Sequence, residues 1–447
     1  MGRLSAVFTA ASLLALAAPT RAAELTHVAT AAEPDSAFNL DLSVRWERTQ
    51  KKATITRERA TAANPPSEPF GRVDDVPELS YGEITNVIIP RLAFGVYQDV
   101  ELHFELPYYL GQDVSWKYAS GITVDSDSTI STNNINADGV SCGAGVNCPL
   151  FPARVDDTTV YHGGVLGDLK AGVAWGIFSD VKDDTKPYWL VGLDVTFPTS
   201  ALYDPWAGRD QSNFFLSPYN LPSKVAGVGH KIWKFDLQTA LSKRMGKIDP
   251  YFKAHLELPR RFSSTYSNCD HVNDPNAPPP GAAFTSVTRT NCGLAQWKDE
   301  AGAKLPVTTG VIFGIEFVPL EDRFEGQRVV IDTRLTADYT SKSRWYNELT
   351  DATGKLLYTE GYMQVSGLIS MLFRASRYIA VQGQAGYTFE TSHLLTGEPL
   401  GVTAAADINT SPNQNPNFDW RWDAPGRRFR ITSAGSINLQ VSGIINF

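Results

Sequence analysis

The chain ends in INLQVSGIINF, residues 437–447, and this stretch decides the fold. Alternate positions carry apolar or small side chains, and most of the positions between them carry amides or a serine. The apolar set is Ile437, Leu439, Val441, Gly443, Ile445 and Phe447, and the other set is Asn438, Gln440, Ser442, Ile444 and Asn446. A period of two residues is typical of a β-strand with one apolar face. An unpaired strand of this kind would be prone to aggregate, so we expect it to be paired on both sides.

The same alternation recurs along the chain, for example in FNLDLSVRWE (38–47) and VELHFELPY (100–108). Each such segment is about ten residues long, which suits a tilted strand that crosses a bilayer. We therefore predict twelve strands. They are 37–48, 81–96, 100–110, 165–178, 187–198, 231–244, 249–259, 307–318, 327–341, 358–373, 378–391 and 429–447.

The connections between these segments are alternately long and short, as in bacterial outer-membrane barrels with long external loops and short periplasmic turns. We therefore predict a transmembrane antiparallel β-barrel in which the last strand pairs with the first. Two more strand-like pieces, 53–59 and 284–290, either extend hairpins above the membrane or raise the count to fourteen. Aromatic residues near strand ends are predicted to form an interfacial girdle. They are Tyr108, Tyr188, Trp233, Tyr251, Tyr339 and Tyr378.

The N-terminus predicts export. Residues 1–22 combine Arg3, an apolar run and a small-residue cleavage site, which is the pattern of a secretory signal peptide. Residues 23–36 are expected to form a short periplasmic segment and 37–447 the barrel. We expect the outer membrane of a Gram-negative bacterium, with membrane lipid as a partner and with Phe447 as the signal that the barrel-assembly machinery recognises.

Composition agrees with a folded membrane barrel and excludes other classes. Of the 447 residues, 43% are hydrophobic and 20% are charged, which argues against disorder. The formal net charge of -8 argues against a nucleic-acid partner. The four cysteines lie in the two longest loops, and export favours the disulfides Cys142–Cys148 and Cys269–Cys292. Zinc at Cys269 with His271 and calcium at Asp125, Asp127 and Asp138 are weaker alternatives, so no metal or cofactor is predicted.

The polar faces of the strands give the candidate functional residues. The predicted pore-lining residues are Arg45, Glu101, His103, Glu105, Lys253, His255, Glu257, Asp332 and Arg334. Inward acidic residues outnumber basic ones, so an open pore should prefer cations. A barrel of this size lies between filled eight-stranded and water-filled sixteen-stranded barrels, which leaves both a narrow pore and a salt-bridged plug open. Glu101, His103 and Glu105 resemble an active site, but no serine in a nucleophile motif accompanies them, so no catalytic residue is predicted.

Three segments carry a resemblance to a known family: GVYQDVELHFELPY (95–108), GDLKAGVAWGIFSD (167–180) and GLDVTFPTS (192–200). They resemble the outer-membrane family named for the meta-pathway of phenol degradation, which is related to long-chain fatty-acid transporters. The resemblance implies a passive channel for small, hydrophobic or aromatic molecules. Residues 23–36 are too short for the N-terminal plug of those transporters, so any gate must come from inward loops or lumen side chains. The alternatives are an outer-membrane enzyme acting on lipid or peptide, and a closed barrel with an adhesive or structural role.

Overall fold

The computed structural model describes residues 39–60, 73–97, 99–122, 128–135, 158–179, 185–205, 227–270, 302–322, 325–401 and 413–447, with short pieces between them. The predicted signal peptide, the strand-like piece 284–290, and His271, Asp125, Asp127 and Asp138 lie outside these residues. No helix in the described part is long and apolar enough to cross a membrane.

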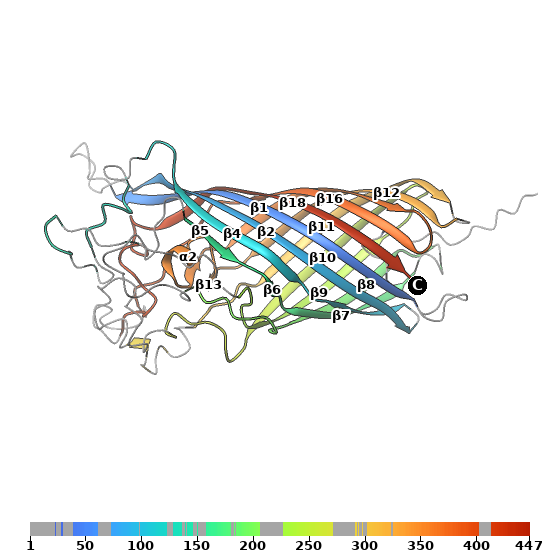
Figure 1. Cartoon of the computed structure of the whole chain (residues 1–447), viewed down its shortest axis with the longest axis horizontal. Coiled ribbons are helices and arrows are strands. Elements are labelled where there is room, and N and C mark those ends of the chain that lie inside the picture. The colour runs from blue at the N-terminus through green and yellow to red at the C-terminus, as the bar shows by residue number, and fades with distance from the viewer. Residues whose placement is uncertain are drawn as a thin grey trace, which may run out of the picture.

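The described chain forms one closed antiparallel β-barrel (Figure 1), with 12 strands around the ring. The strands are β1 (Leu40–Ala60), β2 (Val73–Tyr97), β3 (Val100–Glu105), β7 (Leu169–Phe178), β8 (Tyr188–Phe197), β9 (Ile232–Ser242), β10 (Ile248–Arg261), β11 (Thr308–Asp322), β12 (Gln327–Thr340), β15 (Tyr362–Arg374), β16 (Ile379–Glu390) and β18 (Phe429–Asn446). The ring closes where β1 pairs with β18, from Asp41 opposite Asn446 to Arg57 opposite Phe429. The prediction that the last strand pairs with the first is confirmed.

Two of these strands are continued by shorter pieces. β4 (Tyr108–Tyr118) continues β3 beyond Pro107, and both pair with β2, with a shift of register between Asn86 and Val87. β5 (Thr158–His162) and β6 (Val165–Leu166) precede β7 and pair with β4. Gly163 and Gly164, between β5 and β6, have φ values of 145° and 68°, a conformation that favours glycine.

The first two strands are longer than predicted. The segment 53–59 is part of β1, so it extends a hairpin and adds no strand to the ring. β2 likewise begins at Val73, well before residue 81. The predicted strand 358–373 is wrong at its start, because β14 (Leu357–Thr359) pairs with β13 (Ser343–Trp345) in a separate ribbon and β15 begins at Tyr362.

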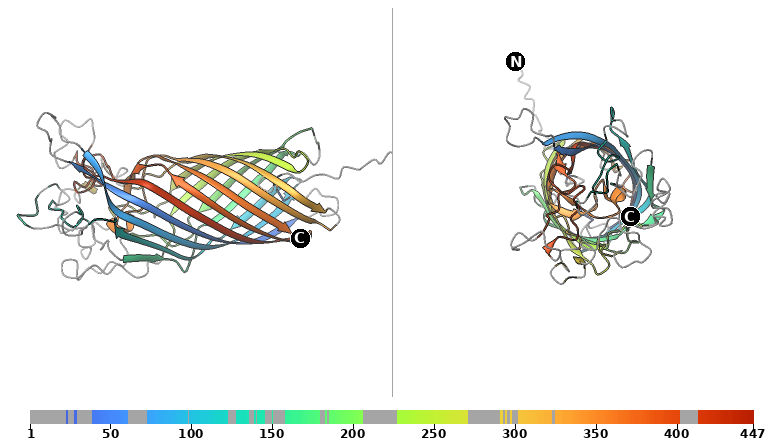
Figure 2. Two further views of the ribbon diagram at one scale, coloured as in Figure 1. Left: turned by 90° about the horizontal axis from the view of Figure 1, so that it is seen from above. Right: turned by 90° about the vertical axis from the view of Figure 1, so that its left-hand side faces the viewer.

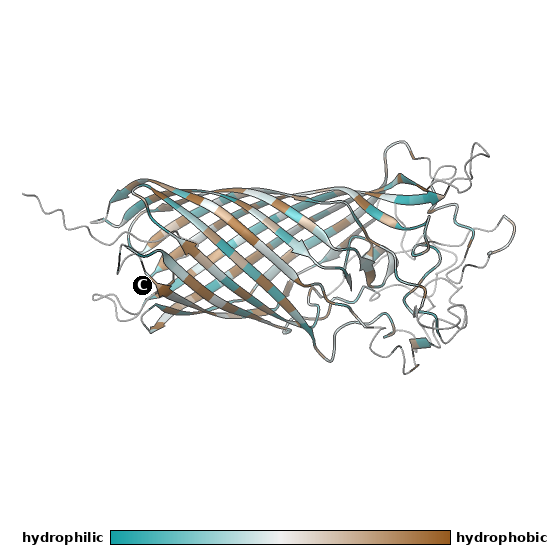
Figure 3. Ribbon diagram, turned by 180° about the vertical axis from the view of Figure 1, so that it is seen from behind, coloured by the Kyte–Doolittle hydropathy of each residue, from teal (hydrophilic) through white to brown (hydrophobic). Residues whose placement is uncertain are grey.

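The barrel wall has an apolar outer face. In β18, Ile437, Leu439 and Val441 are 50%, 41% and 50% exposed, as the alternation predicts, and hydrophobic positions recur over the whole wall (Figure 3). Such a face belongs in lipid, and the protein is a barrel of the bacterial outer membrane. The aromatic girdle is wrong at Tyr188 and Tyr251, which are buried on the inner face because their parity along the strand, rather than their position at its end, sets their direction.

The two ends of the barrel differ. Short turns join β2 to β3, β7 to β8, β9 to β10, β11 to β12 and β15 to β16 at the end where the C-terminus lies (Figure 1). Long connections leave the opposite end. Two of them fold back into the barrel, where the helix α2 (Thr350–Thr353) lies inside the ring of strands when viewed along the barrel (Figure 2). We call the described parts of these connections, 341–361 and 391–428, the loop plug.

Candidate functional site: the lumen and its loop plug

The lumen is lined by paired charges. Arg91 on β2 lies with its Nη2 2.5 Å from Glu101 Oε1 and its Nε 3.4 Å from Glu105 Oε1. His103 lies 3.2 Å from Glu101 through Nδ1 and 2.9 Å from Asp194 through Nε2. Lys170 on β7 completes the row, 2.7 Å from Asp194. Opposite charges at these distances largely neutralise one another, so the side chains predicted to line a pore form an ion-pair network on the wall.

A second network lies on the neighbouring strands. His255 on β10 contacts Asp338 on β12 at 2.9 Å and Asp236 on β9 at 3.7 Å. The Tyr251 hydroxyl donates a hydrogen bond of 2.7 Å to Asp332, which also pairs with Arg334 at 2.5 Å. These contacts therefore join three strands, β9, β10 and β12, across the lumen wall.

The remaining predicted residues also face the interior. Arg45 pairs with Glu47 at 2.5 Å, and Glu257 with Lys234 at 3.0 Å. Lys253 has no ion pair within the described part of the chain. Glu101 and Glu105 both pair with Arg91 on the adjacent strand, which lies opposite Glu105 in the pairing register.

Part of the N-terminal segment 23–36 lies inside the barrel. Val28 is buried against Tyr188, Leu190 and Ala240. The backbone N–H of Ala29 donates a hydrogen bond of 2.7 Å to Glu101 Oε2. These two residues therefore lie in the lumen, and Ala23 is the other residue of the segment that the structure describes.

The first part of the loop plug is anchored to the wall by buried polar contacts. Lys51 of β1 lies 2.6 Å from Glu348 in the plug and 2.8 Å from Glu390 of β16. The Trp116 indole donates a hydrogen bond of 2.8 Å to the carbonyl of Glu348. Burial alone would raise the pKa of Glu348, but Lys51 lowers it below its ordinary value, so this carboxylate stays ionised.

Apolar packing reinforces these polar anchors. Leu349 and Ala352 of the plug are fully buried in one cluster with Ile55, Tyr81 and Trp116 of the wall. Because closely packed side chains leave little room for solute, the plug closes much of this end of the barrel.

The second part of the plug is held by buried charges. Arg344 contacts Glu398 at 2.5 Å and joins the two connections. Arg421 lies 2.8 Å from Asp419, and its guanidinium stacks 4.4 Å from the centre of the Trp422 ring. Burial raises the pKa of the nearby Asp423 to about 7, so its ionised form is disfavoured.

An aromatic cluster lies where the plug meets the β8–β9 connection. Tyr203 stacks on Tyr346 with ring centres 4.7 Å apart, and His230 lies 4.4 Å from Tyr346 and 5.2 Å from Trp345. Burial among these rings lowers the pKa of His230 to about 3, which keeps the imidazole neutral. We call Tyr203, His230, Trp345 and Tyr346 the aromatic cluster.

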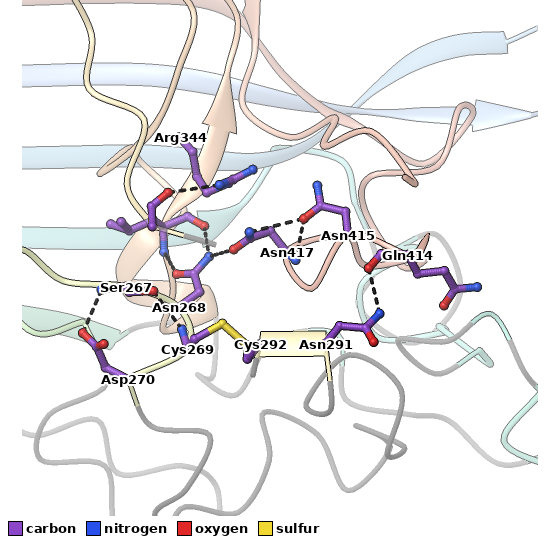
Figure 4. The surroundings of a disulfide bond; sticks show 12 residues. Ser267, Asn268, Cys269, Asp270, Asn291, Cys292, Arg344, Gln414, Asn415 and Asn417 are labelled. Carbon is purple, nitrogen blue, oxygen red and sulfur yellow. Dashed lines mark hydrogen bonds between the residues drawn. A yellow bond between two sulfur atoms is a disulfide. The ribbon is translucent and has the colours of Figure 1, made fainter. Parts of the chain in front are cut away.

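The predicted Cys269–Cys292 disulfide is present (Figure 4). Next to each cysteine, an asparagine holds the loop plug: the Asn268 amide donates to Leu356 O, and the Asn291 amide donates to Gln414 O. The bridge thus ties together two contact points on the plug, and its bonded sulfurs leave no thiolate for the zinc alternative. Cys142 is also disulfide-bonded, and Cys148 lies outside the described residues.

The sequence pattern does not indicate the residues that hold the plug. Lys51 lies beyond residue 48, where the first predicted strand ends, and Glu348 lies in a connection without periodicity. The sequence does hold one signal for Lys51. It lies an even number of residues from the inward-facing Arg45 and Glu47 in an unbroken polar stretch, so its side chain is expected to face the lumen as well.

No protein-family model matches the chain, and no curated protein matches its sequence. Among solved structures, it is similar to the COG4313 outer membrane channel of Pseudomonas putida F1, with 13% identity, a TM-score of 0.41 and coverage of 92% of this chain and 96% of that one. It is also similar to a FadL homologue of Pseudomonas aeruginosa (9% identity, TM-score 0.33, coverage 91% and 90%) and to OmpT of Vibrio cholerae (7%, 0.27, 92% and 98%). Values this low say nothing about function, and the family resemblance stays a prediction.

Proposed function

We propose that the protein is an outer-membrane channel for small molecules, closed at its external end by the loop plug. The observation that carries the proposal is the charged lumen. Ionisable groups are costly to bury away from water, and the polar interior of bacterial barrels holds a water-filled channel in porins and is closed by loops in other barrels. Here the ionisable groups continue from Arg91 on β2 to Asp338 on β12 around the inner wall.

The aromatic cluster supports a narrower proposal, that the solutes are small aromatic molecules. Two of its rings belong to the plug and two to the β8–β9 connection, and offset or edge-to-face stacking stabilises aromatic pairs by about 0.5–1.5 kcal/mol. The family resemblance points to the same solute class. His230 is neutral, so it repels neither neutral nor charged rings.

Two alternatives remain to be tested. No described histidine is hydrogen-bonded to a serine, threonine or cysteine side chain, so no histidine-activated side-chain nucleophile in the described lumen supports the enzyme alternative. The closed-barrel alternative has a specific observation in its favour, because the plug is anchored on several sides.

The test is transport by purified protein in planar bilayers and liposomes. The channel proposal predicts single-channel currents, and swelling of liposomes in small aromatic solutes faster than in sugars of similar size. Replacing Tyr346 with Ala should remove the preference for aromatic solutes and leave the ionic current. A folded, inserted barrel that passes neither ions nor solutes would favour the closed barrel, and release of fatty acid or cleaved peptide would favour the enzyme.

A further inference from the structure

Two glycines lie between partners of the lumen networks. In the pairing register, Gly172 of β7 lies opposite His103 of β3 on one side and opposite Asp194 of β8 on the other. Gly310 of β11 lies in the same way between His255 of β10 and Asp338 of β12. The order histidine, glycine, aspartate across three adjacent strands therefore occurs twice in the lumen wall.

The spacing of the strands explains why the middle residue must be small. Strands two places apart are separated by about 9.5 Å, so a histidine and an aspartate in the same row meet only if their side chains cross the strand between them. They do meet: Nε2 and Oδ1 are 2.9 Å apart in both rows.

A side chain at either glycine would occupy that crossing point. A Cβ at Gly172 would lie 2.1 Å from Asp194 Oδ1 and 2.3 Å from His103 Nε2. At Gly310 it would lie 1.7 Å from Asp338 Oδ1 and 2.5 Å from His255 Nε2. Neither glycine has a positive φ, so space rather than backbone conformation requires glycine here.

The glycine under each histidine–aspartate contact decides where the two side chains lie. An imidazole that reaches over a glycine stays against the barrel wall, whereas one displaced from it must project toward the axis. Both imidazoles are also held from the other side, His103 by Glu101 at 3.2 Å and His255 by Asp236 at 3.7 Å. Lys170 fixes the far carboxylate of the first row.

We propose that Gly172 and Gly310 are positioning residues that hold the two histidine–aspartate pairs flat against the wall, and thereby set the free cross-section of the lumen and the size of solute that passes. The inference rests on the proposed channel function. Neither glycine touches the solute; each acts through the pair that crosses it.

The first test compares alanine variants. Gly172→Ala and Gly310→Ala should lower single-channel conductance about twofold or more and exclude the larger solutes first, because conduction through a constriction depends on its width. Gly383→Ala and Gly443→Ala are matched controls: both glycines lie in exposed wall positions on β16 and β18, and a Cβ there has no neighbour within 4 Å. These controls should conduct like the wild type.

A double-mutant comparison separates positioning from a general effect of the methyl group. In a His255→Ala/Asp338→Ala background, Gly310→Ala should have no further effect on conductance or insertion, since nothing is left to displace. An equal loss in both backgrounds overturns the proposal. So does a Gly310→Ala barrel that fails to insert and is not rescued by that background.

A third measurement does not depend on conduction. The imidazole of His255 in ¹⁵N-labelled barrel should titrate differently in Gly310→Ala than in the wild type and the Gly383→Ala control, because contact with Asp338 is lost. If the wild type carries no current but this difference is seen, the channel proposal fails and the positioning of His255 stands. An unchanged titration overturns the positioning proposal, whether or not the wild type conducts.

Discussion

Val441 and Gln440 are adjacent residues of β18 that face different surroundings. Val441 is 50% exposed on the outer wall, and Gln440 faces the lumen. Arginine on the lipid face near the bilayer midplane costs ~2–4 kcal/mol, whereas lumen positions tolerate it. Val441→Arg should therefore lower the free energy of unfolding in lipid far more than Gln440→Arg. Equal losses in denaturant titrations would show that the strand faces the other way.

Asp423 gives the loop plug a dependence on pH. Its pKa rises from 3.8 to about 7 when the plug folds, so between these pH values the folded plug holds a proton that the unfolded one releases. This contribution is full below the unfolded pKa and is lost as pH rises through about 7. Hydrogen exchange of the plug backbone should show weaker protection at pH 8 than at pH 5.

Asp423→Asn is the control for this effect. An amide cannot titrate, so the variant should lose less protection between pH 5 and pH 8 than the wild type. Its absolute stability will differ, since Asp423 Oδ1 accepts hydrogen bonds from the backbones of Gly397 and Glu398. A parallel pH profile in the two proteins would show that another group controls the plug.

At the scale of elements, two neighbouring lysines of β1 distinguish the loss of a plug anchor from the loss of a positive charge alone. Lys51 points inward to Glu348 and Glu390, and Lys52 is exposed on the outer face. Removing one partner of a buried ion pair costs about 3–5 kcal/mol, because the other charge stays buried. Lys51→Met should therefore loosen the plug and raise conductance or open time. Lys52→Met should change neither in planar-bilayer recordings.

Strand positions were predictable from sequence where lipid lies on one side and the lumen on the other, because that environment imposes a period of two. The period fails at residues 53–58 of β1, where loops cover the wall and consecutive residues from Ile55 to Glu58 are buried. Interior charges such as Glu101 and His255 were predictable from parity alone. Their partners two strands away were not, because the register between strands depends on turn geometry and on glycines such as Gly310. The plug contacts join distant connections and leave no local pattern.

At the scale of the whole molecule, the C-terminus belongs to the seam that closes the barrel. The backbone N–H of Phe447 donates to Leu40 O at 2.9 Å, and Phe447 is 63% exposed at the periplasmic rim. Deleting Phe447 should impair assembly more than Asn446→Ala, since only the deletion removes both the ring and a seam hydrogen bond. Assembly of each variant is measured by the heat-modifiable electrophoretic mobility of the barrel in outer-membrane fractions. If the two variants assemble equally well, Phe447 is not the recognition residue.

The seam between β1 and β18 also constrains the order of folding. It pairs Asp41 of the first strand with Asn446 of the last, so among the described strands of the wall it has the highest sequence separation. Closing so long a loop lowers the conformational entropy of the chain, and no local contact formed at the same time offsets that loss. Topologies of high contact order therefore fold slowly. The wall therefore cannot close until β18 has been synthesised. Until then both edge strands need another partner, and a chain cut short before β18 should remain bound to whatever machinery supplies that edge.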